Sequence, residues 1–502
     1  MSSLDDEKAA QYSQAEVLSS DSSDTSEPLY DPDVGKSAEE RARLDKQIVR
    51  KIDLWLIPWL CLLYLLSFLD RTNIGNARLA GLEDDLHFKG FDYNITLIIF
   101  FISYAGAEPL TNLILKRLSP RVFFTSIILL WGLMMMCMGF VKNMASLLVV
   151  RFLLGLAEAG LFPGVNYYLS CWYKRSELGI RIAIFFSAAA LAGAFGGLLA
   201  AAIAQMAGMG GLSGWAWIFI IEGLATIFVG CFCWWMVFDW PQTARFLTVE
   251  ERQRVLCRLA NDKQGSAGTE DYHKLHVMAA LKDWKTYSYA VISMGFFMPL
   301  YSFSLFLPTI LAGMGHTGTR AQLLTVPPYA VAAALTVAVG WFADRTQWRG
   351  YCNICIPLLG IAGFSMLLAT SDPHIQYAGT FLGAMGIYPC VPNSLAWVAN
   401  NIEGTYKRGV VIGIVVGWGN LNGMVSSSIY NAKQKPRYQT GHGVVLGYLT
   451  FCLLGGSLFT HLMLRAENRR RRSGARDGML AGKSAEQVWA AGDERPDFVY
   501  TL

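Results

Sequence analysis

The sequence has few charged residues for its length. Asp, Glu, Lys and Arg make up 16% of its 502 residues, whereas a soluble domain usually contains about a quarter of them. Apolar residues reach 53%, a composition that excludes a disordered chain and an ordinary soluble enzyme. The net charge is only +4, and no patch combines basic with aromatic residues. We therefore expect no nucleic-acid partner.

The ten cysteines are scattered, most of them within apolar stretches. Such spacing does not form a disulfide framework, and the pair Cys352 and Cys355 has no second pair of ligands nearby. We expect no metal site and no cofactor. Residues 313–318 match the pattern GxGxxG, but a dinucleotide-binding turn follows a strand, and here an apolar helical stretch precedes it. The sequence thus predicts that the protein is not an enzyme.

Long apolar segments dominate the chain. A helix that crosses a bilayer needs about 20 mainly apolar residues. Twelve such segments are predicted, at 53–75, 93–115, 122–141, 144–168, 181–205, 215–238, 287–312, 322–343, 352–370, 375–397, 409–430 and 443–465. The sequence therefore predicts an all-α integral membrane protein, with twelve transmembrane helices in two pseudo-symmetric bundles of six and the lipid bilayer around them.

Polar segments divide the chain into five parts. Residues 1–45 are rich in Ser, Asp and Glu and are predicted to be a disordered acidic tail; they lack the apolar stretch of a secretory signal. An N-terminal bundle is predicted at 46–238 and a charged central loop at 239–286. The C-terminal bundle follows at 287–465, and 466–502 form a second tail.

Lys and Arg residues near the predicted helix ends are unevenly distributed. Most of them lie in the two tails, in the central loop and in the other loops on the same side. Since basic residues concentrate on the cytoplasmic side of membrane proteins, both termini and the central loop are predicted to be cytoplasmic. We expect the protein in the plasma membrane.

Two short segments indicate that the halves are related. Residues 112–121 end the second span of the first half, and residues 340–349 end the second span of the second half. When the two are aligned, Arg117 coincides with Arg345. A parallel repeat of two six-helix halves is one of the architectures that transporters use.

The fourth span carries two opposite charges. Arg151, Gly155 and Glu158 share one helix face. About 10 Å of helix separates the two charges, so each needs a partner from another helix or from water. A charge inside a bilayer costs about 2.5–3.5 kcal/mol, which makes it a candidate for function. A structural ion pair is the alternative interpretation.

The first span ends with Asp70, Arg71 and Asn73. If the chain is oriented as above, these residues lie at a depth similar to that of the fourth span's charges. The similar depth allows either an Asp70–Arg151 or an Arg71–Glu158 contact.

Two more acidic residues lie in apolar spans. Glu108 precedes Pro109 in the second span, where a gating contact is the alternative, and Glu222 lies in the sixth. A buried carboxyl group binds a proton more readily than one in water, and a buried guanidinium binds carboxylate or phosphate through two parallel hydrogen bonds. These residue types together predict an anion that is taken up with protons. The candidates for proton coupling are Glu158, Asp70, Glu108 and Glu222, and those for substrate binding in this half are Arg71, Arg151 and Asn73.

The second half has few charges in its spans but many aromatic and amide side chains. These groups together suit an aromatic or amide-bearing organic substrate, although for any single aromatic residue helix packing or an aromatic belt at the membrane surface is the more common explanation. The candidates for substrate binding here are Phe297, Tyr301, Tyr388, Asn393, Trp397, Trp418 and Asn422.

Four runs of residues resemble a known family. They are LDRTNIGNA at 69–77, EPLTN at 108–112, RFLLGLAEAGLFPG at 151–164 and WIFIIEG at 217–223. With them the chain resembles the major facilitator superfamily. Within that superfamily it resembles the fungal anion:cation symporter group, which includes allantoate, nicotinate and pantothenate permeases. The resemblance covers about residues 45–470.

The resemblance implies two bundles that rock around a central cavity. In the related animal anion symporters, the residues that match Arg151 and Glu158 are tied to substrate and proton coupling. The superfamily's loop motif has an acid followed by Arg. The second half keeps it, whereas the first lacks the acid, and the candidate gating residues are Lys116, Arg117, Asp344 and Arg345. Ala194 stands where the matching motif of exporters has Pro, which favours import.

The sequence thus predicts a monomeric transporter that imports a small organic anion with protons by alternating access. The anion is expected to be a carboxylate, vitamin-like or amide-bearing. A proton-coupled exporter of a metabolite or drug is one alternative. A nutrient sensor that does not transport is another, although such proteins usually carry long cytoplasmic extensions.

Overall fold

A computed structural model of the chain describes residues 30–261, 274–316, 318–403, 405–430, 434–476, 493, 495, 496 and 498–502. Its regular elements there are all helices. The first half contains α2 (Ala38–Leu79), α3 (Leu82–Asp85), α4 (Asp92–Arg117), α5 (Pro120–Met138), α6 (Met144–Glu158), α7 (Leu161–Ser170), α8 (Arg175–Ile203) and α9 (Gly214–Met236). The segment between the halves contains α10 (Val249–Asn261) and α11 (Lys274–Lys282). The second half contains α12 (Trp284–Gly313), α13 (Gly318–Leu323), α14 (Val326–Thr346), α15 (Arg349–Ala369), α16 (Pro373–Ile387), α17 (Cys390–Asn401), α18 (Thr405–Ile429), α19 (Gln439–Gly447) and α20 (Gly456–Arg472).

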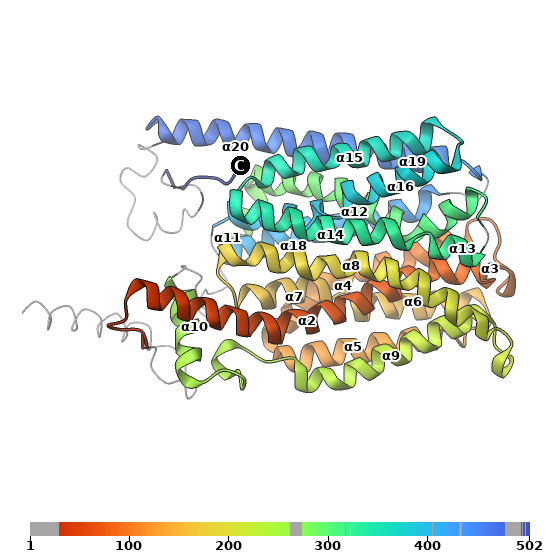
Figure 1. Cartoon of the computed structure of the whole chain (residues 1–502), viewed down its shortest axis with the longest axis horizontal. Coiled ribbons are helices and arrows are strands. Elements are labelled where there is room, and N and C mark those ends of the chain that lie inside the picture. Colours follow the sequence, from red (N-terminus) through yellow and green to blue (C-terminus); the bar gives the residue numbers. More distant parts are fainter. Residues whose placement is uncertain are drawn as a thin grey trace, which may run out of the picture.

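The long helices run side by side along one direction (Figure 1). The start of α2, the C-terminus, α10 and α11 lie at one end of the molecule, on the left of Figure 1, which we call the terminal end. We call the opposite end, with α3 and α13, the loop end. Helices α5 and α9 lie at one side and α15 and α20 at the other, so the two halves of the chain occupy opposite sides of the molecule.

The predicted all-α membrane fold is confirmed. Among the described residues, ten helical segments are long and apolar enough to cross a membrane. Two of the predicted spans, 93–115 and 375–397, are absent from those ten and correspond to α4 and to the pair α16 and α17. The latter two helices meet at Pro389, which has no N–H to continue the hydrogen-bond ladder of the helix.

The predicted disordered tail is wrong for residues 30–45. Ser37 caps α2, because its hydroxyl accepts from the Glu40 N–H at 3.2 Å while the Glu40 carboxylate accepts from the Ser37 N–H. This S-x-x-E capping box was readable in the sequence. Asp33, just before the cap, accepts two hydrogen bonds from Arg254 of α10 at 2.6 and 2.7 Å, and these hold its pKa well below the usual value. Residues 1–29 lie outside the described residues.

Helix α10 lies across the terminal ends of α2 and α8. Arg258 of α10 pairs with Glu177 of α8 at 2.6 Å and with Asp45 of α2 at 3.2 Å. Glu251 of α10 pairs with Lys51 of α2 at 2.7 Å. The segment 239–286, predicted only as a charged loop, therefore includes a helix that ties together two helices of the first half.

Gly155 lets α6 approach α4 closely. A Cβ atom at this position would meet the Ser103 hydroxyl and lie 2.5 Å from the backbone oxygen of Phe100. Gly155→Val is therefore expected to destabilise the protein by about 2 kcal/mol or more, measured as lost monodisperse protein in detergent size-exclusion chromatography. Gly106→Val is the matched control, because a Cβ there meets nothing within 4 Å. Equal yields of the two variants would contradict this account of the packing.

Candidate functional site

Arg71 and Glu158 form a buried ion pair at the centre of the first half. Arg71 Nη2 lies 2.6 Å from Glu158 Oε1, and the two side chains are 5% and 0% exposed. The Ser67 hydroxyl donates to the same oxygen at 2.5 Å. Ser67 and Arg71 are one turn apart on α2, so both face α6. Of the two contacts that similar depth allowed, the structure thus contains Arg71–Glu158.

Aromatic rings surround the Arg71 guanidinium. Its central carbon lies 4.7 Å from the ring centre of Tyr104 and 5.5 Å from that of Phe100, both on α4. Cation–π attraction of this kind stabilises a cation most where water is excluded. The Arg71 charge is therefore held by the ring faces of α4 as well as by the carboxylate.

Hydrogen bonds connect this pair to the second half of the chain. Arg71 Nη1 lies 3.4 Å from the Tyr301 hydroxyl of α12, which donates to Asn420 Oδ1 of α18 at 2.6 Å. Asn420 Nδ2 donates to Glu108 Oε2 of α4 at 2.7 Å. We call these residues, from Ser67 and Glu158 through Arg71, Tyr301 and Asn420 to Glu108, the central network. The central network crosses twice between the halves, so its geometry depends on their relative position.

Arg151 is fully buried but lacks hydrogen-bond partners for Nε and Nη2 among the described residues. The sequence placed it two helical turns from Glu158, and no ion pair joins it to Asp70. Buried guanidinium nitrogens are nearly always satisfied by protein, water or ligand. Arg151 therefore holds two donors that water or an anion can use.

A second polar cluster lies on the side of α2 that faces α5 and α9. Asp70 Oδ2 accepts from Trp131 Nε1 at 2.9 Å and from the Thr226 hydroxyl at 3.1 Å. The Asn73 amide donates to Glu222. Asp70 and Asn73 thus point away from Arg71. Each of Asp70 and Glu222 keeps one oxygen without a partner among the described residues.

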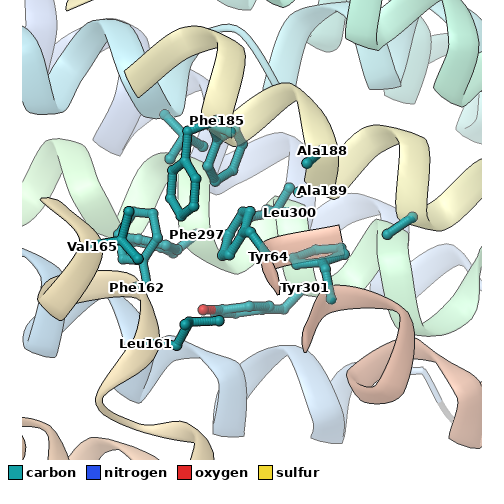
Figure 2. Packing of buried hydrophobic residues seen from close by; sticks show 14 of the residues in the cluster. Tyr64, Leu161, Phe162, Val165, Phe185, Ala188, Ala189, Phe297, Leu300 and Tyr301 are labelled. Atoms are coloured by element: carbon teal, nitrogen blue, oxygen red, sulfur yellow. The ribbon is translucent and has the colours of Figure 1, made fainter. Parts of the chain in front are cut away.

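Buried aromatic side chains extend from the central network into both halves. Phe297 stacks on Tyr301 with ring centres 5.8 Å apart. Tyr64 packs against Phe162 and, at 4.4 Å, against Phe185. Figure 2 shows Tyr64, Phe162, Phe297 and Tyr301 within one cluster of buried side chains. The cluster supplies flat apolar surfaces next to the Arg71 charge.

Tyr388 reaches the same aromatic cluster from the junction of α16 and α17. Its ring centre lies 6.5 Å from that of Phe186, which in turn lies 5.8 Å from that of Tyr64. Its hydroxyl lies 3.0 Å from that of Ser304 on α12. Of the candidates in the second half, Phe297, Tyr301 and Tyr388 therefore lie in or beside the aromatic cluster.

Asn393 and Trp397, also predicted to bind substrate, lie away from the aromatic cluster. Asn393 donates to the Arg349 carbonyl and to Asn353, both on α15. Trp397 Nε1 donates to the Thr501 carbonyl near the C-terminus. Both side chains lie toward the terminal end, because α17 runs away from Tyr388 in that direction.

Helix α18 presents a different amide from the one that the sequence suggested. The Trp418 side chain is 50% exposed, and the Asn422 amide donates to the Trp418 carbonyl within the same helix. Asn420 reaches the central network instead. Alternate helix residues are about 200° apart, so Asn420 must point away from both of its candidate neighbours. The sequence contains all three residues, but no sequence pattern indicated that Asn420 is the one that joins the central network.

The predicted gating residues lie at the terminal end. Asp344 of α14 accepts from the Ile180 N–H of α8 at 2.6 Å and pairs with Arg349, which the sequence analysis did not predict as a gating residue. Arg345 is exposed and lies over the Trp341 ring. Arg117 is also exposed, and the Lys116 side chain lies outside the described part of the chain. Asp344 thus joins the two halves at this end.

Contacts also join the halves at the loop end. The Asn94 amide of α4 donates to the Ser427 carbonyl of α18. The rings of Tyr93 and Phe306 meet edge to face at 6.4 Å. The central network therefore lies between inter-half contacts at both ends.

Comparisons with known proteins agree with this geometry. The sequence pattern of the family described as "Major Facilitator Superfamily" matches residues 60–427. The MFS-type transporter cnsO of Penicillium expansum is 36% identical over 470 residues, which are 91% of this chain and 90% of that protein. The high-affinity nicotinic acid transporter of Saccharomyces cerevisiae is 32% identical over 458 residues, or 91% and 85%.

Among solved structures, the proton:xylose symporter XylE bound to 6-bromo-6-deoxy-D-glucose superimposes with a TM-score of 0.62. The match covers 80% of this chain and 94% of that one, at 14% identity. At this identity the likeness concerns the fold alone. The fungal relatives agree with the resemblance that the motifs of the first, second, fourth and sixth spans carry.

Proposed function

Because the chain belongs to the major facilitator superfamily, and is therefore a membrane transporter and not an enzyme, we propose that it imports a small organic anion together with protons. The observation that carries this proposal is the buried Arg71–Glu158 pair, which also touches Tyr301 of the other half. Breaking a buried ion pair by removing one partner's charge is costly. A site of this kind can therefore link a proton to an anion.

The coupling follows from competition for Arg71. When Glu158 is ionised, it occupies the guanidinium at 2.6 Å. A proton on Glu158 removes that negative charge, and a substrate carboxylate then becomes the best partner for Arg71. Proton and anion thus bind together, while either one alone leaves an unpaired buried charge. Arg151, with two free donors in the described structure, provides further positive charge for the anion.

We propose that the remaining acidic residues bind protons and make less contact with the substrate than the Arg71–Glu158 pair does. Glu108 ends the central network through Asn420, so its charge responds to the position of α18. Asp70 and Glu222 lie behind α2 with Asn73. There they influence Arg151 and the pair through their charge, without touching a substrate at Arg71.

The aromatic cluster sets the class of substrate. Tyr64, Phe297, Tyr301 and Tyr388 offer ring faces, and Asn420 offers an amide beside them. A flat carboxylate such as an aromatic vitamin acid fits these groups better than an inorganic anion does. A relative named as a nicotinic acid transporter supports this choice.

In this proposal, the protein works as a monomer, and transport occurs by rocking of two six-helix bundles. The bundles lie within residues 46–238 and 287–465. Opening the terminal end requires Asp344 to release Ile180, and opening the loop end requires Asn94 to release Ser427. Lys116 and Arg117 end α4, and Arg345 follows Asp344 in the last turn of α14; all three are proposed to take part. We place both termini in the cytoplasm and the protein in the plasma membrane.

Uptake by cells that lack their own vitamin permeases tests this proposal. Labelled nicotinate, pantothenate, biotin, allantoate and short peptides are supplied, each with and without a protonophore. We expect one flat carboxylate to accumulate and the protonophore to abolish its accumulation. If the protein is at the cell surface and no compound enters, the import proposal fails, and an exporter or a sensor becomes the better hypothesis.

A further inference from the structure

The last residues of the chain are bound against the terminal end of the second half, where Figure 1 marks the C-terminus. Asn401 of α17 accepts from the Thr501 N–H at 2.8 Å and donates to the Thr501 carbonyl at 3.0 Å. Asn468 of α20 accepts from the Tyr500 N–H and donates to the Tyr500 carbonyl, both at 2.9 Å. Two asparagines therefore each bind both backbone groups of one residue, as in a site that recognises an extended peptide.

Charged groups bind the same segment at its other end. The buried Asp493 carboxylate pairs with Lys407 of α18 at 2.9 Å and with Lys285 of α12. Asp283 also contacts both lysines, at 2.8 Å from Lys407 and 3.2 Å from Lys285. Burial raises the pKa of Asp283, but the two ammonium groups outweigh this and lower it overall. Two lysines thus share two carboxylates, one of which comes from the segment.

Arg471 of α20 is satisfied largely by this segment. Its Nη1 donates to three backbone carbonyls, those of Asp493, Arg495 and Phe498, at 3.0, 3.0 and 2.7 Å. Its Nη2 donates to the Tyr500 hydroxyl at 2.9 Å, and that hydroxyl in turn donates to the Asp493 carbonyl. The Arg471 guanidinium therefore binds three backbone carbonyls of the segment at once. Without the segment, these donors would lose their partners.

We propose that the terminal ends of α12, α17, α18 and α20 form a peptide-binding site, and that its ligand is this chain's own segment 493–502. Residues 494 and 497 of this segment lie outside the described residues. The site binds an Asp side chain, a Tyr hydroxyl seven residues later and the backbone groups of Tyr500 and Thr501. It also includes Trp397, whose indole N–H donates to the Thr501 carbonyl.

The bound segment has a consequence for the candidate transport site. Lys285 lies in the first turn of α12, which carries Tyr301, and Lys407 lies in the first turn of α18, which carries Asn420. Asp493 and Asp283 both bridge the two helices through these lysines. The segment therefore adds to the contacts between the two helices that carry these groups of the central network.

The test uses the full chain with a protease recognition sequence inserted within residues 477–492. The purified protein is cut in detergent and passed through a size-exclusion column, and the C-terminal peptide that contains residues 493–502 is quantified by mass spectrometry. We expect the peptide to remain with the protein. Complete elution of the wild-type peptide in the small-molecule fractions would overturn the proposal.

Peptide exchange on the cut wild-type protein gives a second measurement that needs no folded variant. A fluorescent copy of 493–502 replaces the bound peptide, and unlabelled competitors then displace it. The competitor with Asp493→Asn is expected to be at least about 100-fold weaker, because it leaves buried lysines short of a carboxylate. The competitor with Val499→Ala is the matched control, since Val499 is 55% exposed, and should equal the wild type. Equal potency of all three peptides would also overturn the proposal.

Discussion

Glu158→Gln is expected to abolish proton-driven accumulation while the exchange of labelled for unlabelled substrate continues. Gln resembles protonated Glu in shape and cannot release a proton. Arg71 would then lose the carboxylate that holds it at 2.6 Å and would stay available to the substrate. Accumulation ratios should fall to about one, with exchange kept within about tenfold of the wild type. Uptake by the variant should no longer fall as the external pH rises.

The control for this variant is Glu83→Gln. Glu83 also pairs with an arginine of α2, Arg78, at 2.8 Å, but at the loop end of the molecule. Glu83→Gln removes a carboxylate from a partly exposed arginine pair and should leave accumulation unchanged. If Glu158→Gln cells still concentrate substrate at acidic external pH, Glu158 is not the coupling residue.

Arg71→Lys is expected to lower the affinity for the substrate by at least about 100-fold at normal surface expression. Arg71 uses one nitrogen for Glu158 and another for Tyr301, and its flat guanidinium lies 4.7 Å from the Tyr104 ring centre. A lysine ammonium keeps the charge but can neither lie flat between rings nor bind a carboxylate with two parallel bonds. Substrate binding to purified protein measures this loss directly.

Arg78→Lys is the matched control, because Arg78 lies on the same helix, pairs with Glu83 and lies over the Tyr93 ring at 4.2 Å. It should bind substrate as the wild type does. Arg151→Lys gives a second comparison, since Arg151 lacks partners for two nitrogens. Should Arg71→Lys keep wild-type affinity while Arg151→Lys loses it, the anion binds at Arg151 and the proposed coupling at Arg71 is wrong.

The periodicity and scarcity of charge were enough to predict the membrane helices. A continuous run of about twenty apolar residues predicts a helix, because a helix satisfies its backbone hydrogen bonds within the segment when water is excluded. The helix face shared by Arg151, Gly155 and Glu158 followed from the 3.6-residue repeat alone. The need of Glu158 for a partner from another helix followed from the spacing, and Arg71 is that partner.

Which residues meet across the halves could not be read from the sequence. Asn420 and Asn422 are equally polar, and only the rotation of α18 against α12 brings Asn420 to Tyr301. Trp397 looked like a residue of a substrate site, yet the direction of α17 takes it to the C-terminal segment. The sequence by itself determined the fold class and the charges that a bilayer makes costly. Only the tertiary structure decided their partners, because a pairing depends on helix rotation and tilt, which many distant packing contacts set together.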